Sequence, residues 1–406
     1  MDEGRYRRDG LYWVSPYNFL ESPSGARQTS RKVLVHDATL RDGEQTPGVV
    51  FRKEDKVAIA RALDEAGVDR IEAGMPAVSR EDYEAVGEIC ALGLRADILA
   101  FVRAIPEDID RAAECGVDGV VIEVPIGWPK LVHQFKWTRD DVLRRSVPVI
   151  DRARSKGLRA VFFPYDSTRA REEDLDALLS GIMAESPPDS IGIVDTMGCA
   201  TPEAVAWLTR KYREATELPV EIHTHNDFGL ALATTLAAVG AGAEVAHVCV
   251  NGLGERTGNA PLEELVLALD LLYGERECRD YRAIVRLSEL VGQLSGIPIP
   301  RNKPVIGDGN FTRESGIGAN FVVENPLVMF AVHPEMLGRR GNIVLGKKSG
   351  TPSINFKLKE LGIDDPGEEA VARLLEAVKD LGILRKGLVS DREFMEIVRT
   401  VLGGDQ

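Results

Sequence analysis

The sequence lacks any run of about 18 apolar residues, the length that a helix needs to cross a bilayer. Its first residues, MDEGRYRRDGLYWVSPYNFLESPSG, contain no apolar stretch of the kind that a secretory signal carries. We therefore expect no membrane partner for this protein.

Cysteine is scarce and irregularly placed. The number of cysteines is odd, and their spacing contains neither a CxxC pair nor the pattern of a disulfide framework. The five are Cys90, Cys115, Cys199, Cys249 and Cys278. This usage favours a reducing, cytoplasmic location.

Positive charge is also in short supply. The 50 Lys and Arg residues stand against 64 Asp and Glu residues, which gives a formal net charge of −14. Binding to a phosphate backbone needs a basic surface, so we expect no nucleic-acid partner. A small anionic substrate stays compatible with this balance, because local arginines and a bound metal set the field inside a pocket.

What the chain does have is a regular alternation of strand and helix patterns. Its 406 residues are 44% hydrophobic, enough for a large core. Short β-rich runs alternate with longer helical stretches between residues 33 and 272. The runs are VLVHDAT (33–39), VDRIEAG (68–74), ADILAFV (96–102), VDGVVIEV (117–124), LRAVFF (158–163), SIGIVDT (190–196), VEIHTH (220–225) and VAHVCVN (245–251). Eight βα units predict an α/β fold of the (β/α)8 TIM-barrel type, with a doubly wound open sheet as the alternative.

Composition divides the chain into three predicted parts. Residues 1–30 are rich in Tyr, Arg, Pro and Ser without a period, which indicates an extended N-terminal arm lying on the barrel or on a partner subunit. Residues 31–280 form the predicted barrel and catalytic domain. Residues 281–406 hold a linker or dimerisation segment and a helical tail, so we expect a small, mostly helical C-terminal appendage.

Residues suited to chemistry follow three of the predicted strands. Arg41 and Asp42 follow the first strand, and the seventh ends in HTHND, where His223 and His225 are two apart and so share one face. Asn259 lies in the loop after the eighth strand. Functional residues of TIM barrels lie at this end of the strands, so we expect these side chains to meet at one mouth.

Together these residues predict an open metal site. One carboxylate, two imidazoles and one amide oxygen suit Mn, Mg, Zn or Co rather than a closed structural site. Such a cation would polarise the carbonyl of a 2-oxo acid, and Arg41 would neutralise the charge that develops on its oxygen. Each motif taken alone has another explanation. His223 and His225 could be exposed at a strand end by chance, and Asp42 could be a turn residue.

Four segments carry a resemblance to a known family: DATLRDGEQ, IGIVDTMGCATP, HTHNDFGLA and NGLGERTGNAPLEE. From about residue 33 to residue 350 the chain resembles the metal-dependent isopropylmalate, homocitrate and citramalate synthases, with hydroxymethylglutaryl-CoA lyase as a more distant relative. The resemblance implies a Claisen condensation, in which the enolate of acetyl-CoA adds to a 2-oxo acid and hydrolysis then releases CoA. It also implies a homodimer.

The resemblance implies roles for individual residues. The metal ligands would be Asp42, His223, His225 and Asn259, and the electrostatic stabiliser would be Arg41. Contacts to the 2-oxo acid would come from Gln45, Arg103 and Thr196. Three further candidates follow predicted strands: Tyr165 and Glu255 as catalytic residues, and His133 either as a substrate contact or as a residue without a role in the site.

Three positions depart from the family pattern. Gly318, in GIGANF, replaces a histidine that takes part in proton transfer, and Lys348, in GKKSG, replaces another histidine. Tyr165, in FFPYDSTR, stands in place of a glutamate. The general base therefore stays open, with Tyr165, Lys348 and His333 as candidates.

Two other functions remain open at this point. A metal-dependent lyase or aldolase would split a 3-hydroxy acid or its thioester with the same ligands. The related lyase carries a cysteine in its loop after the eighth strand, whereas NGLGERTGNA has none. A non-catalytic homologue that binds metal or a 2-oxo acid is the second alternative.

Overall fold

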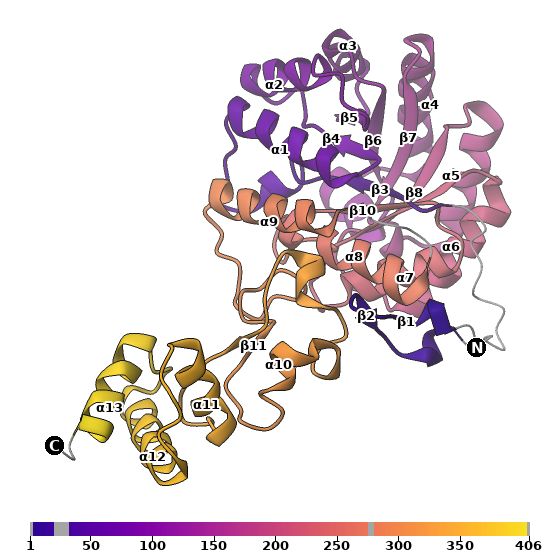
Figure 1. Cartoon of the computed structure of the whole chain (residues 1–406). Helices are drawn as coiled ribbons and strands as arrows, with labels where there is room; N and C mark the ends of the chain where they lie inside the picture. Colours follow the sequence, from indigo (N-terminus) through magenta and orange to yellow (C-terminus); the bar gives the residue numbers. More distant parts are fainter. Residues whose placement is uncertain (1–2, 20–31, 275–279, 404–406) are drawn as a thin grey trace. The chain divides into compact units, whose positions relative to one another are not determined.

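The computed structural model describes residues 3–19, 32–274 and 280–403. These residues fall into two compact units, one within Leu20–Ile299 and the other within Met1–Phe19 and Pro300–Gln406. The first unit contains the barrel, and the second contains most of the C-terminal helices (Figure 1). None of the described helices is both long and apolar enough to span a bilayer.

Eight parallel strands close into a barrel in the first unit. In chain order they are β3 (Leu34–Asp37), β4 (Arg70–Glu72), β5 (Asp97–Arg103), β6 (Gly119–Pro125), β7 (Arg159–Tyr165), β8 (Ser190–Asp195), β9 (Val220–Thr224) and β10 (Val245–Val248). The last strand, β10, pairs with the first, β3, with His247 opposite His36. This pairing confirms the predicted TIM barrel and excludes the open sheet.

Helices surround the strands, as Figure 1 shows. They are α1 (Lys53–Ala66), α2 (Arg80–Cys90), α3 (Pro106–Cys115), α4 (Arg139–Ser155), α5 (Glu172–Glu185), α6 (Pro202–Thr216), α7 (Ala231–Gly240), α8 (Leu262–Ala268) and α9 (Tyr281–Ser295). Local sequence fixes their starts. Thr138 and Asp141 form a capping box before α4, and a proline opens α3 and α6, where a missing N–H costs nothing.

Alternation along the strands separates two apolar layers. On β6, Val120, Ile122 and Val124 face the helices, whereas Val121 belongs to a smaller cluster inside the barrel. This apolar group, the inner barrel cluster, consists of Leu99, Phe101, Val121, Val161, Phe163 and Val194. Because side chains alternate along a strand, the residues one pleat beyond this cluster also face the interior, toward the mouth.

The second unit begins with the described N-terminal residues. Strands β1 (Arg7–Arg8) and β2 (Tyr12–Trp13) form a hairpin. The Trp13 N–H donates to the Ala331 carbonyl at 2.8 Å, and the His333 N–H donates to the Leu11 carbonyl at 2.7 Å. Residues 3–19 therefore form a hairpin joined to residues 331–333 rather than an extended arm, because these backbone groups find partners there.

The rest of this unit is mostly helical. Strands β11 (Thr312–Arg313) and β12 (Asn342–Ile343) pair, and α10 (Phe321–Glu324) lies between them in sequence. Three helices follow: α11 (Thr351–Glu360), α12 (Glu368–Arg385) and α13 (Asp391–Gly403). Their buried residues form a core of their own, which includes Leu345, Ile354, Leu374, Val378 and Phe394.

Candidate active site at the barrel mouth

The turn after β3 carries a buried carboxylate that faces two histidines. Asp42 is only 1% exposed. Its Oδ2 lies 3.1 Å from His223 Nε2 and 3.6 Å from His225 Nε2, and Arg41 lies 3.6 Å from the same oxygen. The Glu255 backbone N–H reaches the other carboxylate oxygen at 3.5 Å. One oxygen therefore faces two imidazole nitrogens, an arrangement that three metal ligands can share.

Asn259 completes this set. A bridge joins the backbones of His225 and Asn259, which brings the loop after β10 to the end of β9. The loop needs its glycines, because a Cβ at Gly258 would lie 1.8 Å from the Gly252 carbonyl oxygen. Asn259 Nδ2 donates to the Leu253 carbonyl at 3.1 Å. Its Oδ1 is buried and accepts no hydrogen bond from the described residues, so it fits the role of a metal ligand.

The protonation states also fit a cation. Burial alone would raise the pKa of Asp42, but Arg41 and the two histidines lower it well below its usual range. Burial lowers the pKa of His223, and that of His225 to about 4, in spite of the nearby Asp42 charge. Near neutral pH the site therefore holds an ionised carboxylate and two neutral imidazoles, which are the forms that bind a divalent metal.

Arg41 is held in place from two sides. Its Nε donates to a carboxylate oxygen of Glu72, the last residue of β4, and its guanidinium lies 4.2 Å from the centre of the Phe101 ring. Burial alone would raise the pKa of Glu72, but Arg41 and His36 lower it to about 2. Glu72 is therefore a permanently charged anchor for Arg41.

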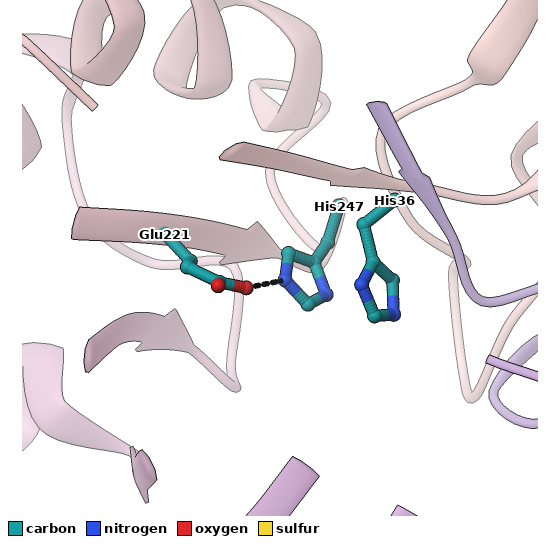
Figure 2. Close-up of side chains that lie close together, drawn as sticks. All are labelled: His36, Glu221 and His247. Atoms are coloured by element: carbon teal, nitrogen blue, oxygen red, sulfur yellow. Dashed lines mark hydrogen bonds and ion pairs between the residues drawn. The ribbon is translucent and has the colours of Figure 1, made fainter. Parts of the chain in front are cut away.

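A second histidine–carboxylate cluster consists of His36 on β3, Glu221 on β9 and His247 on β10 (Figure 2). His247 Nε2 lies 2.7 Å from Glu221 Oε2, and His36 Nε2 lies 3.0 Å from Glu72 Oε2. The two rings stack with their centres 3.9 Å apart and their planes inclined by 16°. Because a metal binds in the plane of an imidazole, two stacked and nearly parallel rings are poorly oriented to bind one ion together. Each ring already has its own carboxylate, so this inner cluster is a hydrogen-bonded network rather than a metal site.

Three predicted substrate contacts lie near strand ends with different surroundings. Thr196 Oγ1 accepts the Asp166 N–H at 2.7 Å, which joins the ends of β7 and β8. Arg103 is exposed and donates to both oxygens of Asp108, at 2.8 and 2.9 Å. Gln45 is exposed in the short helix η3 (Gly43–Gln45). Among the described residues, no hydrogen bond or ion pair joins these side chains to Asp42.

The remaining candidates differ in their orientation. The Glu255 side chain is 54% exposed and pairs with Arg256 at 3.1 Å, so only its backbone reaches Asp42. His133 is exposed on the helical turn η4 (Lys130–Phe135). Tyr165 packs beside the inner barrel cluster, and burial, followed by the nearby Glu123, raises the pKa of its phenol. A neutral phenol can donate a hydrogen bond but is a poor base near neutral pH.

Gly318, His333 and Lys348 belong to the second unit. Gly318 has a φ of +69°, a conformation that glycine adopts without strain. His333 Nδ1 accepts the Glu335 N–H at 3.3 Å and so caps the helix η9 (Pro334–Leu337). Lys348 is exposed, with its Nζ 3.9 Å from Glu314. The contact of His333 is that of a structural cap.

Sequence reasoning did not single out three interior glutamates. They are Glu72 on β4, Glu123 on β6 and Glu221 on β9. Each lies directly between two apolar residues of a predicted strand, as in VVIEV. Since buried strands seldom carry an unpaired charge, that pattern is the signal that would have found them.

The fold and this donor set define a class: a TIM barrel with a candidate divalent-metal site at the carboxyl ends of its strands. Comparison with known proteins gives the family. Residues 32–291 match the HMGL-like family, and residues 305–386 match the homocitrate synthase post-HMGL domain-like family. The chain belongs to the HMGL-like family, which confirms the resemblance drawn from its motifs.

Similar proteins have three different names. Homocitrate synthase AksA of Methanopyrus kandleri is 42% identical over 371 residues, which cover 91% of this chain and 93% of that protein. A probable 2-isopropylmalate synthase of Ignicoccus hospitalis is 42% identical over 374 residues, with 92% and 93% covered. (R)-citramalate synthase CimA of Methanocaldococcus jannaschii is 40% identical over 371 residues, with 91% and 75% covered.

Among solved structures, an HMG-CoA lyase from Brucella melitensis has the same fold. It superposes with a TM-score of 0.57 at 20% sequence identity and covers 66% of this chain and 99% of that one. This likeness concerns the barrel fold.

Proposed function

We propose that the protein is a divalent-metal-dependent acyltransferase that condenses acetyl-CoA, or a related acyl-CoA, with a 2-oxo acid. The products would be a 2-hydroxy dicarboxylic acid and CoA. The observation that carries this proposal is the cluster of Asp42, His223 and His225 at the barrel mouth. The chain that holds this cluster is similar, to nearly the same degree, to proteins named homocitrate, isopropylmalate and citramalate synthase. Because these identities lie between 40% and 42%, overall similarity does not select the 2-oxo acid.

The proposed ligands of the metal are Asp42, His223, His225 and Asn259, and the candidate ions are Mn, Mg, Zn and Co. An ion held there supplies Lewis-acid polarisation of the ketone of the 2-oxo acid. Arg41, fixed by Glu72, would place its positive charge beside the oxygen that becomes negative when the new carbon–carbon bond forms. A prealigned charge of this kind needs no reorganisation during the reaction.

The other proposed roles follow from position. The 2-oxo acid would be contacted by Gln45, Arg103, Thr196 and His133. The Thr196 hydroxyl is already held in place, because it accepts the Asp166 N–H. Tyr165 would act as a hydrogen-bond donor in catalysis, since its phenol stays protonated. Glu255 would support the site through its backbone N–H on Asp42.

Two further parts of the proposal concern the whole protein. We propose a homodimer in the cytoplasm, on the grounds of the family membership and of the scattered, odd cysteines. Light scattering at assay concentration tests the oligomeric state, and a monodisperse monomer would contradict the dimer.

The experiment for the function is an assay of CoA release from acetyl-CoA. Pyruvate, 2-oxoisovalerate, 2-oxoglutarate, oxaloacetate and bulkier analogues are supplied in turn, with Mn or Mg and after removal of metal by a chelator. Release that needs one 2-oxo acid, the metal and His225 supports the proposal and names the substrate. If the folded, metal-loaded protein releases no CoA with any of these 2-oxo acids, the result would favour a lyase or a non-catalytic homologue.

A further inference from the structure

One carboxylate inside the barrel differs from the others. Glu123 lies on β6 two residues beyond Val121, which packs in the inner barrel cluster, and between Ile122 and Val124, which face the helices. Alternation along the strand therefore turns Glu123 into the barrel, one pleat nearer to the mouth than Val121. The side chain is partly buried.

Glu123 has no hydrogen bond or ion pair with any described residue, whereas the other interior carboxylates all have such partners. The others are Asp37 with Thr39, Asp42 with His223, Glu72 with Arg41 and Glu221 with His247. An interior acid without a partner lowers the stability of the fold, and acids of this kind gather at functional sites.

Several of the groups around Glu123 belong to the proposed active site. Its register partners are Arg103 on β5, which is bound to Asp108, and Phe163 on β7. The charges that act on it are those of Arg41, Asp42, Glu72 and Lys130, and it acts in turn on Tyr165. Burial is the largest effect and raises the pKa of Glu123 to about 7, against the opposing influence of Arg41 and Lys130.

No other described group inside the barrel has both the freedom and the chemistry of a base. Asp42, His223 and His225 are the proposed metal ligands, and Glu72 and Glu221 are neutralised by arginines. Both carboxylate oxygens of Asp37 accept hydrogen bonds from Thr39, and His36 and His247 each face a glutamate. Tyr165 stays protonated near neutral pH. Glu123 is the carboxylate that remains available to take up a proton.

We propose that Glu123 is the general base that removes a methyl proton from the acetyl group of acetyl-CoA. A carboxylate oxygen of Glu123 forms the new O–H bond, the C–H bond breaks, and its electron pair forms the carbon–carbon bond to the ketone carbon of the 2-oxo acid. The π electrons of that ketone move to its oxygen, on the side of Arg41. This inference rests on the proposed condensation, and it assigns the base that the sequence left open.

The test compares Glu123→Gln and Glu123→Asp in the metal-loaded enzyme, with Glu185→Gln as control. Glu185 is an exposed acid at the end of α5, before β8 begins. For Glu123→Gln we expect kcat to fall about 100-fold or more, with the metal content and the KM for the 2-oxo acid changed little. The kinetic isotope effect with trideuterated acetyl-CoA should rise, because proton removal becomes slower than the other steps.

Outcomes separate this inference from the proposed function. An active wild type with an equally active Glu123→Gln variant, or with a defect confined to KM, overturns the role of Glu123 and leaves the condensation intact. A wild type that is inactive with every 2-oxo acid overturns both. If the Gln variant fails to fold, the Asp variant decides: we expect a kcat between wild type and one-hundredth of it with a raised isotope effect, and unchanged kinetics would refute the proposal.

Discussion

The barrel contains two buried clusters of two histidines and a carboxylate, and they differ in how their lone pairs are directed. At the mouth, one oxygen of Asp42 faces the Nε2 atoms of His223 and His225. In the inner cluster, His36 and His247 stack. His247 faces Glu221 (Figure 2), whereas His36 faces Glu72. The same residue types thus make a candidate metal site in one place and a hydrogen-bonded network in the other, because ligand geometry rather than composition decides.

The two clusters are nevertheless linked. Glu72 binds His36 with one oxygen and Arg41 with the other. The inner cluster therefore positions the arginine that lies beside the mouth cluster, in the way that residues behind the ligands of a metal orient those ligands.

The largest expected effect comes from the mouth cluster. Asp42→Asn replaces the charged ligand with a neutral amide while the size of the side chain is kept. We expect metal content to fall from about one ion per chain to near zero and CoA release to fall about 1000-fold or more, since the electrostatic contribution of the ion is lost. Elemental analysis and the CoA assay measure this, and full metal content in the variant would contradict the ligand assignment.

The inner cluster should respond in stability instead. Glu221→Gln leaves Arg70, 2.8 Å from Glu221 in the native barrel, as a buried charge without its counterion. We expect a loss of about 3 to 5 kcal/mol in the free energy of unfolding, measured in urea, with metal content unchanged in the folded fraction. Loss of the metal at unchanged stability would reverse the roles that we give to the two clusters.

The link between the clusters should show in kcat. Glu72→Gln removes the charge that holds Arg41 and keeps the size of the side chain. We expect kcat to fall about 10- to 100-fold, with metal content and the KM for the 2-oxo acid little changed, because the developing negative charge loses an aligned partner. Steady-state kinetics on metal-loaded protein measure this split, and a defect in KM alone would mean that Glu72 acts in substrate binding.

The smallest expected effect is a gain in stability. The pKa of Glu123 is raised to about 7 in the folded chain from an ordinary value of 4.5, so its ionisation opposes folding. Glu123→Gln should therefore stabilise the metal-free protein by up to about 3 kcal/mol above pH 7, and the gain should shrink to nothing as the pH falls through 4.5. Urea unfolding at pH 8 and pH 4.5 measures it, and an equal effect at both values would contradict the origin that we give.

Sequence patterns predicted the barrel because its strands are short apolar runs separated by well-marked helices. Each of the eight predicted runs overlaps a barrel strand, with boundaries that differ by up to a few residues. The mouth cluster could be predicted for a related reason, since residues that follow parallel strands meet at one end of the barrel whatever their separation in sequence.

The inner network could not be predicted in the same way. His36 and His247 are neighbours only because β10 closes onto β3, and the stacking of their rings depends on that register. The orientation of the Glu255 side chain likewise depends on the loop, where Arg256 adopts a φ of +58°. Sequence alone named Glu255 as a candidate, and the structure shows its side chain pairing with Arg256.

The most direct test of the difference between the clusters is anomalous X-ray scattering from crystals of the protein equilibrated with Mn²⁺. We predict one manganese peak, bounded by Asp42, His223, His225 and Asn259, and no peak at His36 and His247. The central claim is that geometry makes only the mouth cluster a metal site. A manganese ion between His36, His247 and Glu221 would contradict it, and so would the lack of a manganese ion at the mouth at a saturating concentration.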